Sequence, residues 1–355
     1  MEQPTMIELR SDTFTLPTRA MRQAAFDAEV GDDVYGEDQT VNRLERLAAQ
    51  MLGKPAACFM PSGTMANLAS ILTHCPRGTE ILVGDESDIY NYEAGGASVV
   101  GGLVYHPVPT NPDGTLAIAA LDEAIRDASD SQFAEAALIC LENTHNRCGG
   151  VPLPLAYLAE VREFATARGL AIHMDGARIF NAAAALGVAP TEITQYADSL
   201  QFCLSKGLAA PVGSMAVGDE RFIYRVRRLR KMLGGGMRQI GMMAAPALVA
   251  LETMVERLHD DHRLARRLAE GLAQIPSVHI DLQTVQTNIV IFEVRDKRYT
   301  WKTFLDALQA EGVRMGELGH GRIRAVTHYG ISSEDIDRAI AAVERVLAPT
   351  RTSSN

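Results

Sequence analysis

The sequence predicts an α/β protein whose mostly parallel sheet is covered by helices on both faces. Between residues 64 and 217, short apolar runs alternate with segments of helical periodicity, which is the pattern of such a sheet. Near residue 242 the pattern changes to two long helical segments, followed by strand, helix, strand and helix. At 355 residues, the chain is long enough for a large domain and a smaller α/β domain.

The predicted strands of the large unit lie at residues 80–84, 136–141, 170–174, 199–204 and 213–218. Residues 154–168 form a predicted helix, with Pro154 at its start and Gly169 after its end. In the small unit, the predicted strands are residues 287–294 and 322–328, and the predicted helices are residues 300–311 and 333–347. We therefore divide the chain into residues 1–241, residues 242–350 and a disordered tail of residues 351–355.

The composition is that of a globular protein and favours a small-molecule ligand. Hydrophobic residues make up 47% of the chain, and no apolar stretch is long enough to span a membrane. The net charge of −10 disfavours a nucleic-acid partner, since such binding depends on Lys and Arg. The five cysteines lack C-x-x-C spacing, and the first residues lack a signal-peptide pattern. We expect a cytoplasmic protein without disulfides, a zinc site or a membrane partner.

Lys206 follows a predicted buried strand and precedes small or apolar residues. A charged lysine at such a place is unfavourable unless its amine is paired or used covalently, and lysines of lowered pKa are the ones that form Schiff bases. Taken alone, the position is more typical of a lysine whose amine extends from a strand end to solvent.

Two further features raise the significance of this lysine. Asp175 ends another predicted strand, and ligands of α/β proteins gather at the carboxyl ends of strands, so Asp175 and Lys206 are expected in one crevice. Ser62, Gly63 and Thr64 precede a predicted helix, a pattern that binds phosphate, although a plain N-cap has the same pattern. An amine for a Schiff base, a carboxylate for a pyridine nitrogen and a phosphate cradle together match pyridoxal 5′-phosphate (PLP).

A series of longer motifs occurs in order along the chain: RSDTFT, VGDDVYGEDQTVNRLE, PSGTMAN, YEAGG, LENTHN, HMDGARIFNA, LSKGL, PVGS and RKMLGGGMRQ. The series resembles the L-threonine and L-allo-threonine aldolases of the β-eliminating lyase superfamily, from about residue 7 to residue 347. The resemblance implies the aspartate aminotransferase-like fold, PLP fold type I, in which homodimers or homotetramers place their active sites at subunit interfaces.

The resemblance implies that Lys206 carries the cofactor, that Asp175 contacts its pyridine nitrogen and that the cradle holds its phosphate. Arg178 and Arg324 are implied to bind the substrate carboxylate, a role that suits a planar guanidinium fork. Ser11 is implied to lie near the same carboxylate. We count Arg178 among the cofactor-binding residues as well.

Three more residues receive a role from the resemblance alone. Arg238, after the glycine run at residues 234–236, is implied to reach the phosphate of the neighbouring subunit, and Lys231 is implied to lie close to that site. His145 is similar to the histidine that lies near the substrate hydroxyl in this family, although a single histidine after a strand is more often structural.

Asp88 marks a departure from the family. The segment before YEAGG usually begins with a histidine whose ring stacks on the cofactor, and this chain has Asp88 there, which has no ring. A carboxylate at this place disfavours acidic substrates and favours cationic or hydroxyl-bearing ones. Two other interpretations stay open: His106 or His145 supplies the stacking, or Asp88 points away.

The implied reaction is a retro-aldol cleavage of β-hydroxy-α-amino acids to glycine and an aldehyde. Its hydroxyl proton would go to His145, to Asp88 or to a water that they position. A different PLP reaction on the same scaffold, such as β-elimination, transaldol chemistry or cyclisation, is the alternative, since a fold alone does not decide the chemistry.

Two other classes of function are disfavoured. A non-catalytic binding protein does not need the complete set of Lys206, Asp175, Arg178 and Arg324. A metal hydrolase is disfavoured because His259 and His262, in a segment typical of a solvated helix, lack a third ligand, and we expect no catalytic metal.

Overall fold

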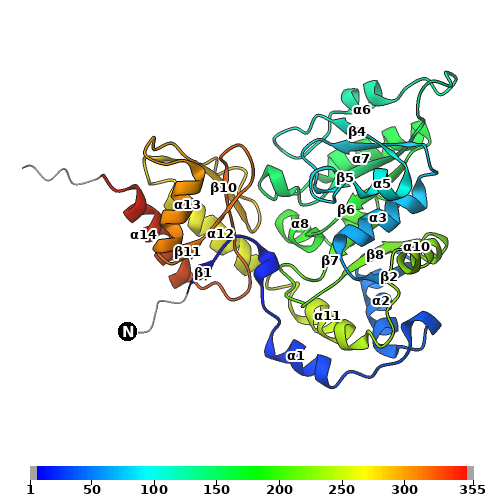
Figure 1. Cartoon of the computed structure of the whole chain (residues 1–355), viewed down its shortest axis with the longest axis horizontal. Coiled ribbons are helices and arrows are strands. Elements are labelled where there is room, and N and C mark those ends of the chain that lie inside the picture. Colours follow the sequence, from blue (N-terminus) through cyan, green and yellow to red (C-terminus); the bar gives the residue numbers. More distant parts are fainter. Residues whose placement is uncertain (1–5, 350–355) are drawn as a thin grey trace, which may run out of the picture.

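In the computed structural model, which describes residues 6–349, a seven-stranded sheet lies at the centre of the larger of two units (Figure 1). Its strands are β2 (Ala56–Met60), β3 (Glu80–Gly84), β4 (Val104–Val108), β5 (Ala136–Glu142), β6 (Ala171–Asp175), β7 (Ser199–Cys203) and β8 (Ser214–Gly218). Their order is β2-β8-β7-β6-β5-β3-β4, and β8 runs antiparallel to both of its neighbours while the other pairs are parallel.

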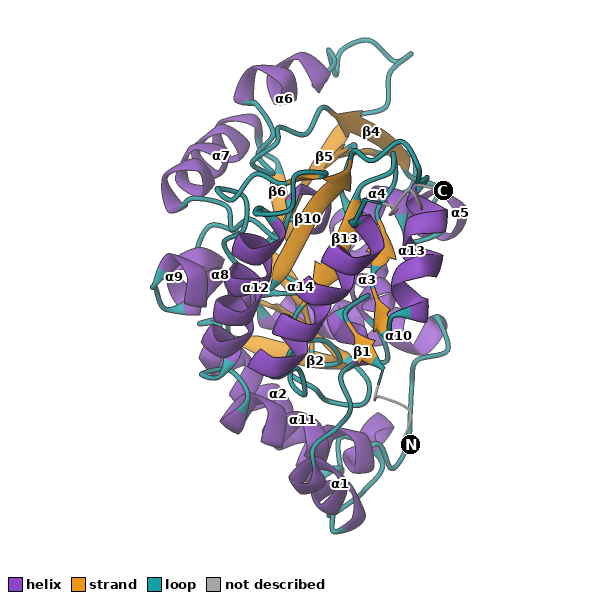
Figure 2. Ribbon diagram, turned by 90° about the vertical axis from the view of Figure 1, so that its left-hand side faces the viewer, coloured by secondary structure: helices purple, strands orange, loops and turns teal. Residues whose placement is uncertain are grey.

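Helices cover both faces of this sheet (Figure 2). The helices of the large unit are α1 (Arg19–Phe26), α2 (Gln39–Met51), α3 (Gly63–His74), α4 (Asp88–Asn91), α5 (Gly96–Gly101), α6 (Ile118–Ala124), α7 (Leu155–Arg168), α8 (Ile179–Leu186), α9 (Pro190–Thr194), α10 (Glu220–Met232) and α11 (Gly241–Thr253), of which α1 packs on α11. Successive side chains of a strand point to opposite faces of the sheet. Leu82 packs in the core with α2, α7 and α11, whereas Ile81 and Val83 pack in the core beneath α3 and α5. Burial on both faces explains the nearly continuous apolar runs of these strands.

The small unit is an antiparallel four-stranded sheet with helices packed against it. Its sheet holds β9 (Val278–His279), β10 (Ile289–Val294), β12 (Gly316–Glu317) and β13 (Ile323–Val326), and its helices are α12 (Leu258–Leu272), α13 (Trp301–Ala310) and α14 (Ser333–Leu347). A separate parallel pair joins β1 (Ile7–Glu8), from the start of the chain, to β11 (Val313–Arg314). The N-terminal segment therefore belongs to the core of the small unit, in which Ile7 and Leu9 are buried.

The α/β class and the mostly parallel sheet are confirmed, and the five predicted strands of the large unit are present. The sequence interpretation missed β2 and β4. The core of the large unit includes α11, and the core of the small unit includes β1, so the packing does not follow a division at residue 241. That division stays a prediction, and the predicted tail of residues 351–355 lies outside the described residues. Within residues 6–349, no helix combines the length and the apolarity needed to cross a bilayer.

Candidate active site

Two adjoining cavities lie where the parallel strands of the large sheet end. Their volumes are about 290 and 300 Å³, and we call them the Asp175 cavity and the Arg324 cavity after one residue of each. Asp175 is the last residue of β6, and Lys206 follows β7. Lys206, Asp88 and Tyr92 line both cavities, so an amine and a carboxylate stand where the two cavities meet.

The start of α3 forms one wall of the Asp175 cavity. Ser62 is the N-cap of the helix, and its Oγ accepts a hydrogen bond from Met65 N at 3.2 Å. The backbone N–H groups of Gly63 and Thr64 have no acceptor within the described part of the chain. A Cβ on Gly63 would lie 3.0 Å from Cys203 Sγ, so glycine lets the helix begin close to the end of β7. The free donors and the positive end of the helix dipole make this wall suitable for an anion.

Asp175 is buried, and neighbouring groups hold both of its carboxylate oxygens. Oδ1 accepts hydrogen bonds from Gln201 Nε2 at 2.5 Å and from Ala177 N at 3.0 Å, and Oδ2 accepts from Asn67 Nδ2 at 2.9 Å. Burial raises the pKa of Asp175, whereas the charge of Lys206 and the bonds from Gln201 and Asn67 oppose that rise. The three donors orient a carboxylate that lines the cavity.

Lys206 is only partly buried, although it follows the fully buried strand β7 and precedes buried residues, as the sequence predicts. Its charge lies close enough to lower the pKa of both Asp175 and Asp12. The lysine therefore extends into the shared space of the two cavities, where a ligand would cover it.

Two glutamates, the buried Glu142 and the partly buried Glu93, accompany Asp175. Glu142 ends β5, pairs with Asp175 in the sheet, and accepts a hydrogen bond from Asp88 N at 2.6 Å. Burial, with the charges of Asp88 and Asp175, raises the pKa of Glu142 well above its usual range. Burial and Asp175 have the same effect on the pKa of Glu93. Both shifts favour the protonated, neutral form of the two glutamate side chains beside Asp175.

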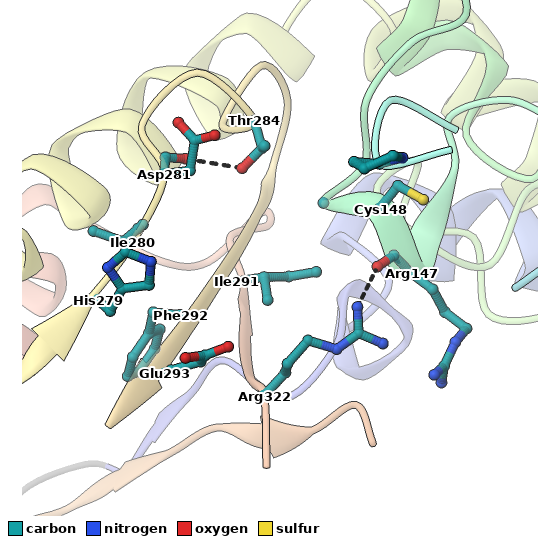
Figure 3. Close-up of a pocket in the computed structure, with 12 residues that line it drawn as sticks. Arg147, Cys148, His279, Ile280, Asp281, Thr284, Ile291, Phe292, Glu293 and Arg322 are labelled. Atoms are coloured by element: carbon teal, nitrogen blue, oxygen red, sulfur yellow. Dashed lines mark hydrogen bonds between the residues drawn. The ribbon is translucent and has the colours of Figure 1, made fainter. Parts of the chain in front are cut away.

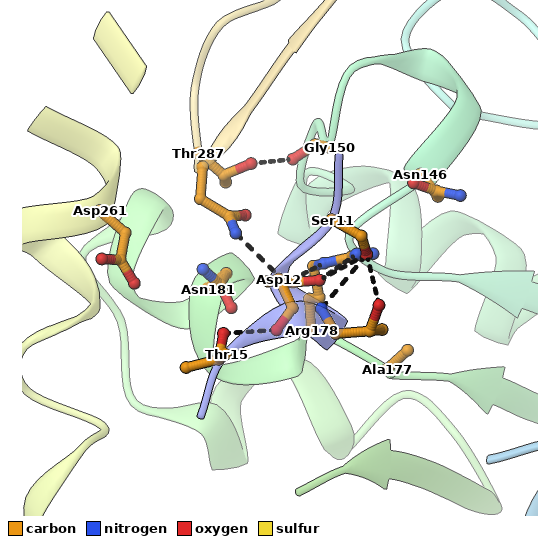
Figure 4. A network of polar contacts seen from close by, with 12 residues as sticks. Ser11, Asp12, Thr15, Asn146, Gly150, Ala177, Arg178, Asn181, Asp261 and Thr287 are labelled. Carbon is orange, nitrogen blue, oxygen red and sulfur yellow. Dashed lines mark hydrogen bonds and ion pairs between the residues drawn. The ribbon is translucent and has the colours of Figure 1, made fainter. Parts of the chain in front are cut away.

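Arg178 and Ser11 line the Arg324 cavity, and both lie beside Asp12 (Figure 4). Asp12 binds the Arg178 guanidinium with two hydrogen bonds, from Nε and from Nη2, each 2.7 Å long. Asn288 Nδ2 donates to the same carboxylate at 3.2 Å. Burial favours a higher pKa for Asp12, but Arg178 outweighs it, and the pKa lies well below its usual range. The sequence predicts that the Arg178 guanidinium binds a substrate carboxylate. In the structure one edge of this guanidinium already binds Asp12, so only its other edge is available to a substrate.

Arg324 extends from β13 into the cavity that bears its name. Its Nη1 donates to Asn146 Oδ1 at 2.7 Å, and its Nη2 donates to the Arg10 carbonyl at 3.2 Å. The buried Nε of Arg324 has no partner within the described residues. Burial and the nearby Arg178 lower the pKa of Arg324. Two guanidinium groups close enough to repel one another are a suitable site for a carboxylate.

Asn146 connects this arginine to Asp88. While its Oδ1 accepts from Arg324, its Nδ2 donates to Asp88 Oδ1 at 3.1 Å. Asp88 therefore faces the cavities, because it lines both of them, and the interpretation in which it points away is wrong.

His145 lies behind the wall of the site. Only 2% of it is exposed, and its Nδ1 has no hydrogen-bond partner within the described residues. Burial lowers the pKa of His145 to about 4, so the ring is neutral at physiological pH. Among the described residues that line the two cavities, Asn146 is present and His145 is not. Its catalytic role stays a prediction.

Lys231 and Arg238 lie away from both cavities. Lys231, near the end of α10, lines a basic cavity of about 470 Å³ with Arg227, Arg228 and Arg230. The half-exposed Arg238 forms an ion pair with Asp32 at 2.8 Å. Within a single chain these residues do not meet Lys206, so their role toward a neighbouring subunit stays a prediction.

A further cavity, of about 230 Å³, shares no lining residue with the active-site cavities (Figure 3). Cys148 and Arg322 line it, and Arg322 Nη1 donates to the Arg147 carbonyl at 3.2 Å. Among residues 6–349, no three His, Cys, Asp or Glu side chains are grouped so that they would hold a metal ion. His262 instead lies 3.1 Å from Asn181 Nδ2.

The polar groups that line the Asp175 cavity are those that PLP needs. Free amide groups at a helix start suit its phosphate, a buried and oriented carboxylate suits its pyridine nitrogen, and Lys206 suits a covalent link. The sequence interpretation brought Ser62, Gly63, Thr64, Asp175 and Lys206 to one place, and the structure has all five on one cavity.

The sequence interpretation missed the polar residues that hold this set, although each left a signal. Gln201 interrupts the apolar run of β7, and Asn67 is a polar residue on the buried side of α3. Asp12 and Asn146 directly follow Ser11 and His145, which were singled out. A polar residue in an otherwise buried pattern needs a partner, but the pattern does not say which one.

The chain matches known proteins over nearly its whole length. The profile of the β-eliminating lyase family matches residues 8–296. The low specificity L-threonine aldolase of Escherichia coli (strain K12) is 45% identical over 343 residues, which cover 97% of this chain and 100% of that protein. The low-specificity L-threonine aldolase 1 of Arabidopsis thaliana is 44% identical over 353 residues, which cover 98% of this chain and 99% of that protein.

Solved structures confirm the predicted fold. The threonine aldolase of Leishmania major matches with a TM-score of 0.81 at 18% identity, over 96% of this chain and 100% of that one. The serine palmitoyltransferase of Sphingomonas wittichii matches with a TM-score of 0.74 at 18% identity, over 96% of this chain and 87% of that one. The chain therefore has the aspartate aminotransferase-like fold, PLP fold type I.

Proposed function

Because this chain belongs to the β-eliminating lyase family, we propose that it is a PLP-dependent threonine aldolase that cleaves β-hydroxy-α-amino acids to glycine and an aldehyde. One observation carries the proposal. Lys206 stands where a cavity suited to the cofactor meets a cavity with two arginines, so a cofactor and an amino-acid carboxylate would be held on either side of one amine.

The residues of the Asp175 cavity would hold the cofactor. Lys206 would bind it covalently, the amide groups of Gly63 and Thr64 with the Ser62 hydroxyl would bind its phosphate, and Asp175 would keep its ring nitrogen protonated. When bound, PLP supplies an electron sink for the bond that breaks at the substrate Cα. The bonds from Asn67 and Gln201 keep the Asp175 carboxylate oriented toward the cavity.

The residues of the Arg324 cavity would bind and orient the substrate. Arg324 and the edge of Arg178 that Asp12 does not occupy would hold the α-carboxylate, and Ser11 would add a hydroxyl. Asp12 and Asn146 fix the two guanidinium groups in advance, which lowers the entropy lost on binding.

Asp88 is the proposed base for the substrate hydroxyl proton, directly or through one water. Its carboxylate lines both cavities and accepts from Asn146, so it is held in reach of a substrate bound between them. This assignment is favoured over His145, which is buried behind the wall. A carboxyl group at this place also favours substrates whose side chains carry a hydroxyl or a positive charge.

The active enzyme is proposed to be a homodimer or homotetramer with shared sites. The exposed side chains of Val34, Tyr224 and Met232 line the same cavity as the basic residues of α10 and form a surface suited to a second copy of the chain. Lys231 and Arg238 would reach the cofactor phosphate of that copy. Mixing a Lys206→Ala variant with an Arg238→Ala variant should then restore part of the lost activity, because mixed assemblies contain intact sites. No recovery in assemblies shown to exchange subunits contradicts the shared site.

The reaction itself is tested with purified protein loaded with PLP. L-Threonine, L-allo-threonine and phenylserine are supplied separately, and glycine, aldehyde, keto acid and ammonia are measured. We expect glycine and aldehyde in equal amounts, and none with Lys206→Ala. Keto acid and ammonia without glycine would show that the enzyme catalyses a β-elimination instead.

A further inference from the structure

A chain of polar side chains leads from the protein surface to Asp175 and ends at Asn67, which lines the Asp175 cavity together with Lys206. It begins at His74, the last residue of α3, and passes through Ser199 of β7 and His173 of β6 to Asn67 of α3. The contacts are 2.7 Å from His74 Nε2 to Ser199 Oγ, 2.8 Å from Ser199 Oγ to His173 Nδ1, and 3.0 Å from His173 Nε2 to Asn67 Oδ1. Asn67 then donates to Asp175 Oδ2 at 2.9 Å.

The orientation of the Asn67 amide is determined by its neighbours. Its Nδ2 lies 2.8 Å from Glu93 Oε1 and 2.9 Å from Asp175 Oδ2. An amide nitrogen has two protons to donate to these two carboxyl groups, whereas an amide oxygen in its place would face the oxygen of the Asp175 carboxylate, which has no proton to give. Asn67 Oδ1 therefore faces His173 and accepts its hydrogen bond.

This orientation sets the direction of every other bond. Since Asn67 Oδ1 can only accept, His173 Nε2 carries a proton and donates it. Burial lowers the pKa of His173 to about 3, so the ring is neutral and its Nδ1 has only a lone pair. Ser199 then donates its single proton to His173 Nδ1, and His74 Nε2 must donate to the Ser199 oxygen. All the N–H and O–H bonds point toward Asp175.

We propose that His74, Ser199, His173 and Asn67 are a one-way hydrogen-bond chain that positions Asp175 and keeps it ionised for the cofactor. The inference rests on the proposed function, since it gives these residues a role in PLP binding. Each bond polarises the next, so the positive end of the whole chain faces the carboxylate. Asn67 touches the carboxylate directly, and the other three are positioning residues that act through it.

Burial makes the chain difficult to replace. His173 and Ser199 are fully buried, so water cannot enter between them to supply a missing bond. His74 ends the chain at a surface cavity of about 280 Å³, where its ring stacks on Phe222 at a centroid distance of 4.8 Å. The chain of hydrogen bonds therefore extends from the protein surface to the carboxylate of Asp175.

The direction of the chain is tested on the full-length protein, both without PLP and loaded with it. Nitrogen-15 labelling of the histidine rings and NMR at pH 6 to 9 report which ring nitrogen carries the proton. We expect His173 to be neutral with its proton on Nε2 at every pH, and His74 to carry a proton on Nε2. A protonated His173 ring, or one with its proton on Nδ1, overturns the proposal.

The role of the chain is tested by PLP binding to variants, measured by equilibrium dialysis. His173→Leu removes the donor to Asn67 and should weaken PLP binding about tenfold, and His173→Gln, which retains one donor and one acceptor, should stay within about twofold of the wild type. Ser199→Ala should weaken binding about threefold. Its matched control is Ser70→Ala, which removes a buried hydroxyl that has no hydrogen-bond partner among residues 6–349 and should leave binding unchanged.

The absorbance of the bound cofactor gives a second measurement that a purely structural role would not change. We expect the pH midpoint of that absorbance to move in His173→Leu and Ser199→Ala and to return in His173→Gln. Unchanged binding and an unchanged midpoint in Ser199→Ala overturn the proposal, and this variant together with His173→Gln decides the question if His173→Leu does not fold. If the wild type binds no PLP at all, the proposed function fails, whereas the proton positions seen by NMR still test the direction of the chain.

Discussion

At the scale of single residues, Asp88 connects the two halves of the site. Its side chain stands where the cavities meet, and its backbone N–H is held by the buried Glu142. The carboxylate has no ring surface with which to cover a cofactor, but it is a base in reach of both cavities. Asp12 has a different function, since it lies fully buried against Arg178 and fixes that guanidinium.

Replacement of Asp88 should therefore affect the rate more than the binding of substrate. We expect Asp88→Asn, which keeps the size and can still contact Asn146, to lower kcat about 100-fold in glycine formation from L-threonine, with a smaller change in KM. Asp306→Asn, an exposed change on α13, is the control and should leave kcat unchanged. Asp88→His should alter the preference among β-hydroxy amino acids, and unchanged rates and selectivity in both Asp88 variants would show that this residue does not take part.

At the scale of secondary structure, the sequence predicts elements well where a pattern is long or bounded by turn residues. The strands β3, β5, β6, β7 and β8 were found because each is a buried apolar run. β4 was missed because it is a half-exposed edge strand that contains Pro107, and such strands lack the buried pattern. β2 was missed because its five residues run almost directly into α3. Short apolar runs of this kind do not distinguish strand from helix.

The site residues whose positions depend on backbone geometry could be predicted from the sequence. Those whose positions depend on side-chain pairing could not. A strand end and a helix start identify Asp175 and Gly63 from neighbouring residues alone. The contacts of Asn146 with Arg324 and of Asn67 with His173 join residues far apart in the chain, so no local pattern contains them.

The start of α3 allows its capping and phosphate-binding roles to be separated. Ser62 Oγ accepts from Met65 N, and its own proton stays available to a phosphate. We expect Ser62→Ala to lower the free energy of unfolding by about 1 kcal/mol and also to weaken PLP binding about fivefold. Ser332→Ala, the matched cap of α14, should cause the same loss of stability, measured by denaturant unfolding, with no loss of PLP binding. If PLP binds Ser62→Ala as tightly as the wild type, Ser62 is only a cap.

At the scale of the whole molecule, buried neutral histidines make the stability depend on pH. Burial lowers the pKa of His145 and of His262 to about 4 and that of His173 to about 3, compared with 6.5 in an unfolded chain. Below pH 6.5 the unfolded chain takes up protons that the folded chain does not, so acid favours unfolding. The stability that these residues contribute is complete above pH 6.5 and falls as the pH approaches 4.

His262 offers a test outside the active site. The quantity measured is a slope, the change of the unfolding free energy with pH. Between pH 6 and pH 5, each such histidine contributes at most ~1.4 kcal/mol per pH unit to this slope. We expect His262→Gln to reduce that slope by about one proton in urea unfolding at fixed protein concentration. His279→Gln, an exposed change on β9, should leave the slope as it is. An equal slope in His262→Gln and the wild type would show that His262 does not stay neutral when folded.

The pairing of β1 with β11 also determines when the site can form during synthesis. Leu9 N donates to the Arg314 carbonyl at 2.8 Å, and Val326 N donates to the Leu9 carbonyl at 2.8 Å. The next residues, Ser11 and Asp12, line or support the Arg324 cavity. During synthesis, Leu9 is made long before its partners Arg314 and Val326, which lie about 300 residues further along the chain. The large sheet can begin to fold much earlier, so the substrate-binding half of the site is among the last parts to assemble, because its contacts have the longest sequence separation.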